Sequence, residues 1–245
     1  LQWIYDTIRS KMAVYATSDL HGFSISKFNQ LLKVIGFSEN DWLYILGDVI
    51  DRNNDGGIAI LLWLLEQPNG QLIRGNHEQM MLSCSWAFHQ ITDEALSNIS
   101  ASDIDNLNRW LANGANPTLS AIKHLLHTSP ESVEDIMAYL RDTPLCESVE
   151  VNGQSFLLCH SGFQNFDKNK KLSDYSETEI LWNRPNKGDR YFDDILTVIG
   201  HPPTSHYGCQ GKAFRADTWI DIDVGASAGT APMFLRLDDL KEIYF

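Results

Sequence analysis

Residues 42–52 read Trp-Leu-Tyr-Ile-Leu-Gly-Asp-Val-Ile-Asp-Arg, an apolar run that stops at a glycine and an acidic residue. An apolar run of this length, bounded by turn residues, predicts a buried strand. Four other runs end in the same way: 12–16 before Asp19 and His21, 71–73 before Asn76, 156–159 before His160, and 197–199 before His201. Sites in open α/β sheets form beyond the carboxyl ends of the strands. We therefore expect one sheet to bring these side chains, with Asp48, to one rim.

The pattern of elements divides the chain into three stretches. Residues 12–78 alternate strand and helix patterns, with helix candidates at 24–35 and 57–65, which predicts a parallel sheet with helical crossovers. Residues 79–143 lack strand patterns and favour helices. Residues 145–245 return to short strands, predicted at 147–151, 155–159, 197–199, 219–224 and 233–237, with a hairpin at Asn152-Gly153. We expect one α/β domain over 1–245 with a helical insertion at 82–143.

The composition of the chain disfavours nucleic acids and membranes as binding partners. The 245 residues are 43% hydrophobic and 21% charged, which is typical of a globular protein. A formal net charge of −13 disfavours nucleic acid binding, so an anionic substrate must be attracted locally by metals and arginines. No apolar stretch approaches the ~20 residues of a membrane span. Four scattered cysteines without a Cys-x-x-Cys pair, and a start without a signal-peptide layout, predict a cytoplasmic protein.

The polar strand ends carry enough oxygen and nitrogen ligands for two divalent cations. Paired cations hydrolyse phosphate esters, because they make a nucleophile from water and neutralise the phosphoryl oxygens. A bridging ligand is needed, and Asp48 lies in the middle of the set. We expect Asp19 and His21 to bind one ion, and Asn76, His160 and His201 to bind the other; His206 is the competing candidate for His201. Mixed His, Asp and Asn ligands suit manganese, iron or zinc better than calcium or magnesium, which prefer oxygen ligands alone.

The leaving group also needs a proton donor. His77 directly follows a predicted ligand, so it must lie near the metals. Asp51 could hold one ring nitrogen of His77 and aim the other N–H at the leaving oxygen. Arg52 lies next to Asp51 and Arg74 lies near His77 in the sequence, and their planar guanidinium groups suit bidentate phosphate binding. These four residues are the predicted catalytic group, with both arginines also contacting the substrate.

The motifs together resemble the metallophosphoesterases of the PPP phosphatase class, most closely the phage lambda-type and bacterial Ser/Thr protein phosphatases. The matching stretches are Asp-Leu-His-Gly at 19–22, Gly-Asp-Val-Ile-Asp-Arg at 47–52, Arg-Gly-Asn-His-Glu-Gln-Met-Met at 74–81, Trp-Asn-Arg at 182–184 and Gly-His at 200–201. The resemblance implies a calcineurin-like β-sandwich flanked by helices in four layers, and two manganese-type ions. It also implies direct attack by a bridging hydroxide, and a further substrate-binding arginine at Arg184.

Three positions depart from that family. Ser18 and Asn53 stand where the family usually has glycine, and Pro202-Pro203 follows His201 where the family has threonine. Asn is the non-glycine residue that best tolerates a left-handed backbone, so we expect the turn at Asn53 to be kept. No departure removes a predicted ligand.

The resemblance favours a phosphatase acting on phosphoserine and phosphothreonine in proteins or peptides, and phosphotyrosine is also open. The alternative is a hydrolase of dinucleoside polyphosphates. Symmetrical bacterial members of that class typically lack the His of the first motif and the second Asp, which are present here as His21 and Asp51. A third reading, a binding module without catalysis, is disfavoured because the full ligand set and His77 are retained.

Overall fold

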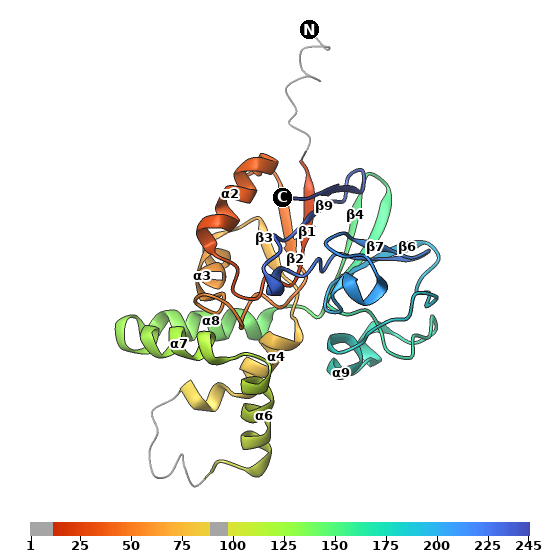
Figure 1. The fold of residues 1–245 in the computed structure, drawn as a ribbon. Coiled ribbons are helices and arrows are strands. Elements are labelled where there is room, and N and C mark those ends of the chain that lie inside the picture. Colours follow the sequence, from red (N-terminus) through yellow and green to blue (C-terminus); the bar gives the residue numbers. More distant parts are fainter. Residues whose placement is uncertain (1–11, 89–97) are drawn as a thin grey trace.

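Two five-stranded sheets pack face to face in the computed structural model, which describes residues 12–88 and 98–245 (Figure 1). The first sheet has the order β10-β9-β1-β2-β3. Its strands are β1 (Val14–Thr17), β2 (Trp42–Ile45), β3 (Gly70–Leu72), β9 (Phe234–Arg236) and β10 (Lys241–Ile243). The second has the order β4-β5-β6-β8-β7. Its strands are β4 (Cys146–Val151), β5 (Gln154–Cys159), β6 (Ile195–Ile199), β7 (Phe214–Arg215) and β8 (Trp219–Asp221). The sandwich implied by the resemblance is confirmed.

The expectation that one sheet carries all the polar strand ends was wrong. Strands β1, β2 and β3 are parallel neighbours in the first sheet, whereas β5 and β6 are parallel neighbours in the second. The parallel strands of each sheet are joined by antiparallel ones, β9 and β10 at one edge of the first sheet and β4 and β7 at the two edges of the second. A strand pattern does not say which sheet the strand joins. The site therefore forms where the carboxyl ends of two sheets meet.

Alternating residues of each strand build separate cores. Val14 and Ala16 of β1 face the second sheet, whereas Tyr15 between them faces the helices on the other side. In β5, Phe156 and Leu158 face the first sheet, whereas Leu157 faces an outer cluster with Trp219. This period of two is what a strand buried on both faces requires. Three apolar layers result: helices on sheet, sheet on sheet, and sheet on the outer loops.

Helices α2 (Ile25–Ile35) and α3 (Ile58–Glu66) cover the outer face of the first sheet. Helix α2 ends at Gly36, whose φ of 73° is the left-handed conformation that glycine adopts without strain. Helix α3 is apolar on almost every face, because it packs between β3 on one side and α7 and α8 on the other. Both helices confirm the sequence prediction to within one residue at each end.

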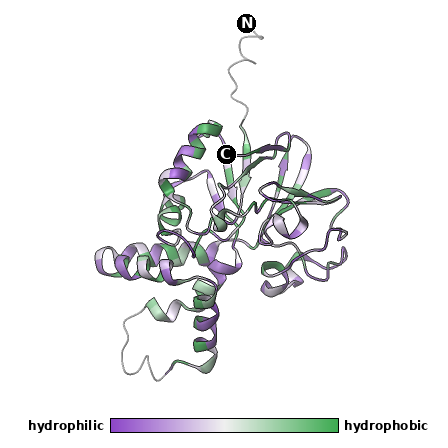
Figure 2. Cartoon of the chain, in the orientation of Figure 1, coloured by the Kyte–Doolittle hydropathy of each residue, from purple (hydrophilic) through white to green (hydrophobic). Residues whose placement is uncertain are grey.

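The predicted helical stretch forms α4 (Asn76–Ser83), the 3₁₀ turn η1 (Ser85–Phe88), α6 (Ala101–Ala112), α7 (Asn116–Thr128) and α8 (Pro130–Asp142). Residues 89–97 of that stretch lie outside the described residues. Helix α8 starts with proline, which has no N–H to leave unpaired in the first turn. Figure 2 shows hydrophilic and hydrophobic residues side by side on α7 and α8, as expected of helices with one buried face. That residues 1–245 form a single domain with an insertion at 82–143 remains a prediction.

The second sheet carries fewer helical segments. Helix α9 (Glu177–Leu181) begins at Ser176, whose side chain accepts the N–H of Glu179 while the Glu179 carboxylate accepts that of Ser176. The 3₁₀ turns are η2 (Leu172–Asp174), η3 (Thr204–Tyr207) and η4 (Ala226–Ala228). Within residues 12–88 and 98–245, no helix has the length and hydropathy to cross a membrane.

A buried carboxylate braces the loop after β2. Glu78, in the first turn of α4, is fully buried and accepts the backbone N–H groups of Asp48 at 2.9 Å, Val49 at 2.8 Å and Gly75 at 2.9 Å. Ile50 N–H approaches the same carboxylate at 3.3 Å. Backbone N–H groups buried without water need such a partner. Glu78 therefore fixes two ligand loops relative to each other, and among the described residues it belongs to neither group with metal-ligand spacing.

We predict that Glu78→Ala destabilises the fold by about 3 kcal/mol or more, because several buried N–H groups lose their acceptor. Glu78→Gln keeps one acceptor oxygen and should lose less. Denaturant unfolding, followed by circular dichroism, measures both values. Glu134→Ala, an exposed glutamate on α8, is the matched control and should change stability by at most about 0.5 kcal/mol. A Glu78→Ala protein as stable as that control would show that the brace is dispensable.

Candidate metal centre

The ligand loops turn through a strained backbone. Asp19, His21, Asp48, Asp51 and His201 all have positive φ, at 52°, 41°, 54°, 77° and 74°. Non-glycine residues rarely adopt this conformation, and where they do the surrounding structure must enforce it. Each of these turns lies just beyond a strand of the parallel centres. The chain thus leaves the sheet sharply and directs polar side chains inward.

Close approach of two loops requires glycine at two positions. A Cβ on Gly75 would lie 2.3 Å from Asp48 Oδ1, and one on Gly47 would lie 2.5 Å from His160 Nδ1. Both distances are shorter than any non-bonded contact of a carbon. These glycines therefore let Asp48, Asn76 and His160 come together from three strands.

Asp48 lies at the centre of the site. Its Oδ2 is 3.6 Å from His21 Nε2 and 3.8 Å from His77 Nε2, whereas its Oδ1 is 3.4 Å from His160 Nε2. His21, Asp48 and His77 form one buried group with metal-ligand spacing, and Asp48, His160 and His201 form a second. One carboxylate shared between two such groups is the arrangement that a dinuclear centre requires.

The histidine tautomers leave lone pairs for a metal. His21 Nδ1 is 3.1 Å from the Ile50 carbonyl oxygen, and His160 Nδ1 is 2.7 Å from that of Leu46. A carbonyl only accepts, so both Nδ1 atoms carry a proton, and in the neutral form of each ring the Nε2 atom carries a lone pair. In that form His160 Nε2 and the Asp48 carboxylate, 3.4 Å apart, face each other as two acceptors. Two acceptors held this close are stabilised by a shared cation.

The remaining predicted ligands join the same cluster. Asn76 Oδ1 lies 2.9 Å from His160 Nε2, and the rings of His160 and His201 are 5.0 Å apart. Asp19 Oδ2 accepts the His201 N–H at 2.9 Å, which connects the two sheets. Asp19 Oδ1 and His201 Nε2 are both buried without a hydrogen-bond partner among the described residues. These two orphaned atoms fit a metal site, because a cation would satisfy both.

The protonation of the cluster favours metal binding. Burial raises the pKa of Asp19, and burial with the nearby Asp19 and Glu78 carboxylates raises that of Asp48 well above its usual value. Burial also lowers the pKa of His21 and His201 well below the usual range, so both rings are neutral at pH 7. Neutral imidazole is the form that ligates metals. Ionising the buried carboxylates is unfavourable without a cation. We therefore expect metal binding to stabilise the folded protein.

His77 and Asp51 form a close pair beside the cluster. His77 Nδ1 is 2.6 Å from Asp51 Oδ2, so the ring donates to the carboxylate and turns Nε2 toward the cavity. Burial raises the pKa of Asp51 to about 6, and burial lowers the pKa of His77 well below its usual range. Arg52 Nη2 approaches His77 Nε2 at 3.3 Å. Because a guanidinium only donates, Nε2 accepts in this state and the ring is neutral.

The helical insertion holds this pair, a role that the sequence did not reveal. Trp110 Nε1 donates to Asp51 Oδ2 at 2.8 Å, and the Thr118 hydroxyl donates to Asp51 Oδ1 at 2.6 Å. Both side chains are fully buried. The Arg52 N–H also donates to the Gly114 carbonyl at 2.9 Å. A single Trp or Thr on a predicted helix has no signature that separates such a contact from core packing.

The predicted arginines do not share one location. Arg52 and Arg184 line a cavity of about 210 Å³ over the cluster, together with His21, Asp48, Asn76, His77 and His201. Arg74 lies elsewhere: its Nη2 donates to the carbonyls of Arg141 at 2.7 Å and Thr143 at 3.0 Å. Its Nη1 is 3.5 Å from a Glu177 oxygen. In this position Arg74 ties α8 to α9, and its phosphate contact remains a prediction that the geometry does not support.

Two further features differ from the sequence expectations. Asn53 is not in the left-handed conformation; Arg52 and Asn54 are, and the Asn53 amide donates to the carbonyls of His21 at 3.0 Å and Ser227 at 3.2 Å. Asp223 lines the cavity although the sequence analysis did not single it out. Its pKa is raised well above the usual value by burial and by the Asp19 carboxylate. Its position inside the predicted strand 219–224 hid it, although the structure ends β8 at Asp221 and so places Asp223 just beyond a strand.

A family model described as calcineurin-like phosphoesterase matches residues 12–224. The chain belongs to the calcineurin-like phosphoesterase family. Its family and its two buried ligand groups together indicate a metal-dependent phosphoesterase. The two groups fit a dinuclear centre and do not identify the metal. All the predicted ligand positions fall inside the matched range.

Curated relatives in this family carry one function name. The bis(5'-nucleosyl)-tetraphosphatase, symmetrical, of Chromobacterium violaceum is 32% identical over 104 residues, which are 41% of this chain and 37% of that protein. The protein of the same name from Nitrosomonas europaea is 25% identical over 239 residues, which are 91% of this chain and 83% of that protein. The match thus spans about a third of the first relative's length.

Solved structures support the fold. A candidate diadenosine tetraphosphatase superposes with a TM-score of 0.62 at 13% identity, covering 97% of this chain and 94% of that one. A protein serine/threonine phosphatase from Saccharomyces cerevisiae, similar to human phosphatase PP5, gives a TM-score of 0.52 at 14% identity, covering 97% and 80%. At these identities the likeness concerns the phosphoesterase fold alone.

We predict that Asp48→Asn loses more bound metal than His201→Ala, because Asp48 belongs to both ligand groups and His201 to one. After removal of metal with a chelator and reloading with manganese, we expect two ions per wild-type chain, about one for His201→Ala and fewer for Asp48→Asn. Elemental analysis after desalting measures these ratios.

His206→Ala is the matched control, because His206 is exposed and lies outside both groups. It should retain the wild-type ratio. An Asp48→Asn protein that still holds two ions would contradict the shared carboxylate.

Proposed function

We propose that this chain hydrolyses dinucleoside tetraphosphates symmetrically, giving two nucleoside diphosphates. The alignment with the Nitrosomonas europaea tetraphosphatase over 91% of the chain carries this proposal. The motifs alone favour phosphoprotein hydrolysis and leave this reaction as the alternative, whereas the relatives support this reaction better. The substrate has several adjacent negative charges, which suits a site that concentrates cations within an acidic protein.

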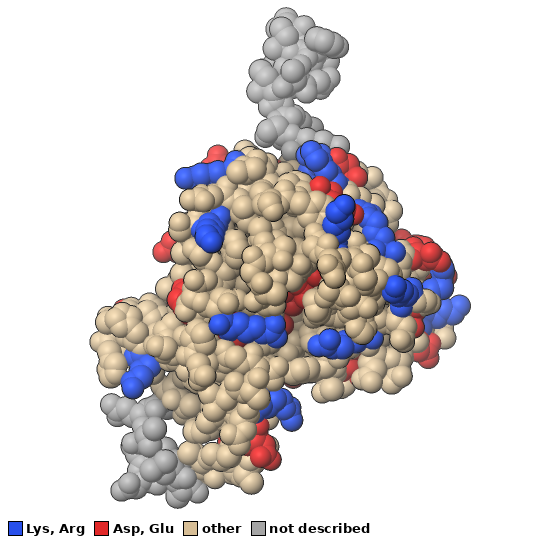
Figure 3. Space-filling model, in the orientation of Figure 1, with Lys and Arg blue, Asp and Glu red and all other residues tan. Residues whose placement is uncertain are grey.

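The charged side chains around the site fit a substrate with several negative charges. Figure 3 shows basic side chains on both sides of the middle of this face, where acidic atoms lie in the hollow. Arg52 and Arg184 are the arginines that line the cavity itself. Two bound cations would supply an activated water and neutralise the phosphoryl oxygens. The arginines would then bind the phosphates on either side of the one that reacts.

The residues of the site divide the work of the reaction. A water oxygen bonds to an inner phosphorus, and the bond from that phosphorus to the central bridging oxygen breaks. Asp19, His21, Asp48, Asn76, His160 and His201 would hold the ions, while Arg52 turns from His77 Nε2 to the phosphate, a stronger acceptor. The leaving group is the terminal phosphate of a nucleoside diphosphate. It is a weak base and departs without being protonated first.

We predict that the manganese-loaded protein converts diadenosine tetraphosphate to ADP alone. Chromatography of the products separates this result from AMP plus ATP, which an asymmetrical cut would give. A phosphoserine peptide, assayed at the same concentration, is the comparison substrate. Phosphate release from the peptide with diadenosine tetraphosphate left intact would overturn the proposal and favour the second candidate.

The second candidate is the hydrolysis of phosphoserine and phosphothreonine in proteins or peptides, and it also rests on a specific observation. Asp51 holds His77 with Nε2 facing the cavity, and Trp110 and Thr118 hold Asp51. A seryl or threonyl alkoxide is a strong base and cannot leave without a proton. A positioned histidine that supplies this proton typically contributes about 10²–10⁴-fold. Such a pair is of more use to a monoester phosphatase than to an anhydride hydrolase.

The effect of His77→Asn on the two substrates tests the role of this pair. We expect the variant to lose about 10²–10⁴-fold in kcat on a phosphoserine peptide, whichever rate the wild type has, because the alkoxide loses its proton donor. The loss on diadenosine tetraphosphate should be at most about tenfold, because its leaving group needs no proton. Steady-state kinetics with both substrates gives the ratio, and metal content of the variant is checked first. Equal losses on both would show that His77 does not act as an acid.

A further inference from the structure

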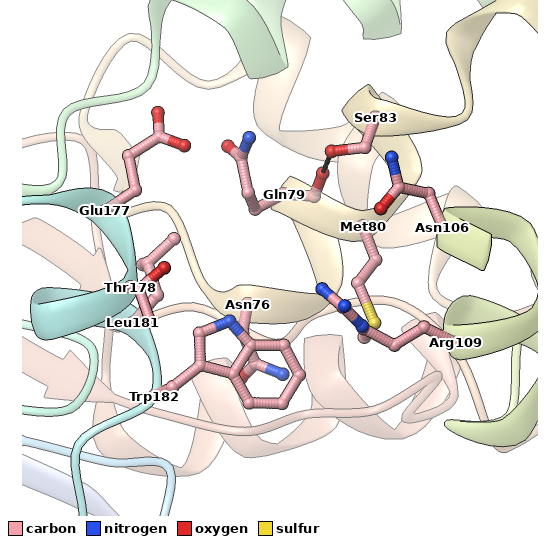
Figure 4. A pocket seen from close by; sticks show the side chains of 10 residues that line it. All are labelled: Asn76, Gln79, Met80, Ser83, Asn106, Arg109, Glu177, Thr178, Leu181 and Trp182. Atoms are coloured by element: carbon pink, nitrogen blue, oxygen red, sulfur yellow. Dashed lines mark hydrogen bonds between the residues drawn. The ribbon is translucent and has the colours of Figure 1, made fainter. Parts of the chain in front are cut away.

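A second cavity opens beside the metal cavity, between helices α4, α6 and α9 (Figure 4). Its volume is about 170 Å³. Asn76 and Trp182 belong to the walls of both cavities, so the two lie next to each other. A ligand part bound here would lie next to a phosphate held at the metals. No step of the proposed reaction places a substrate group in this second cavity.

Trp182 gives the cavity an aromatic wall. Its side chain is 37% exposed, whereas most other tryptophans with a described environment are more deeply packed, and its ring meets the His201 ring edge-on at 6.1 Å. Figure 4 shows the indole along the lower side of the cavity, beside Leu181 and Thr178 of α9. An exposed indole next to a phosphate site is a surface on which a planar base can stack.

The wall opposite α9 is polar. Gln79 and Ser83 come from α4, and Asn106 and Arg109 come from α6. In Figure 4 the Arg109 guanidinium and the Asn106 amide extend from α6 toward the space in front of Trp182. An amide offers a donor and an acceptor side by side, which matches the edge of a nucleobase. The guanidinium suits a phosphate that approaches from the metal side.

The chemistry of these walls identifies a small planar ligand. The cavity is lined by helices and has no free strand edge to which an extended peptide could pair. We propose that it binds one nucleoside of the substrate, with the base on Trp182, its edge at Asn106 and Gln79, and Arg109 on a phosphate between base and metals. This inference rests on the proposed dinucleoside tetraphosphatase activity. It places one nucleoside of that substrate in the cavity at Trp182.

Binding of ADP to the manganese-loaded protein tests the cavity directly. ADP contains the proposed base and phosphates, whereas inorganic pyrophosphate contains phosphates alone. Asn106→Ala should weaken ADP binding about tenfold, with little change for pyrophosphate, because only the base edge loses a partner. Arg109→Ala should weaken both ligands. Isothermal titration calorimetry measures the four affinities.

Asn108→Ala is the matched control. It lies on the same helix two residues from Asn106, where side chains point to another side, and it does not line the cavity. Its ADP and pyrophosphate affinities should equal those of the wild type. If Asn106→Ala binds ADP as tightly as Asn108→Ala does, the nucleoside assignment is overturned.

Kinetics separates failure of this inference from failure of the proposed function. If the wild type cleaves diadenosine tetraphosphate, Asn106→Ala should raise its KM about tenfold, and an unchanged KM would reject the cavity while the function stands. If the wild type cleaves no dinucleoside tetraphosphate, the proposed function fails and the ADP titration alone decides the cavity. A KM increase for a phosphoserine peptide without any ADP binding would assign the cavity to a peptide and overturn the proposal.

Discussion

The buried carboxylate of Asp48 is the constraint on which the rest of the site depends. It faces imidazole nitrogens on two sides, and two of those imidazoles, His21 and His160, hold their protons on the far nitrogen, toward backbone carbonyls. An anion among lone pairs in a buried place is unfavourable unless a cation joins them. The surrounding structure keeps this arrangement through Glu78, through glycines that allow close approach, and through loops with left-handed residues. Such strain is a cost that the well-packed sheets on either side can offset.

Much of this was predictable because the signals are local. An apolar strand followed by Asp, Asn or His marks both a buried segment and the place where the chain leaves it, so Asp19, Asp48, Asn76, His160 and His201 could be named from sequence. Helices α2 and α3 followed from periodicity and from their turn residues. The division of strands between two sheets was not predictable by that reasoning, because β2 and β6 look alike as patterns. Sheet membership depends on pairing between segments far apart in the chain.

The residues that sequence reasoning missed act over long distances and have no local signature. Thr118 reaches Asp51 across 67 positions, and Trp110 reaches it across 59. Arg74 shows the opposite case: its place beside Asn76 suggested phosphate binding, yet the backbone turns its guanidinium toward Thr143 and Arg141. Adjacency in sequence fixes where a Cα lies and leaves the direction of a long side chain open.

The relatives favour an anhydride substrate with a phosphate leaving group, whereas the Asp51–His77 pair favours a monoester with an alkoxide leaving group. The physical basis of that difference lies in His77. In this structure Arg52 donates to His77 Nε2, so the ring has no proton to give until Arg52 finds another acceptor. A bound phosphate is such an acceptor, and its arrival would free Nε2 to take up a proton from solvent, which the ring could then pass to a leaving alkoxide. An anhydride does not need that step, and the pair does not obstruct it. Two bound cations and Arg52 would thus serve either bond, and the choice of substrate would fall to the surfaces beyond them, among them the cavity that shares Asn76 and Trp182 with the metal cavity.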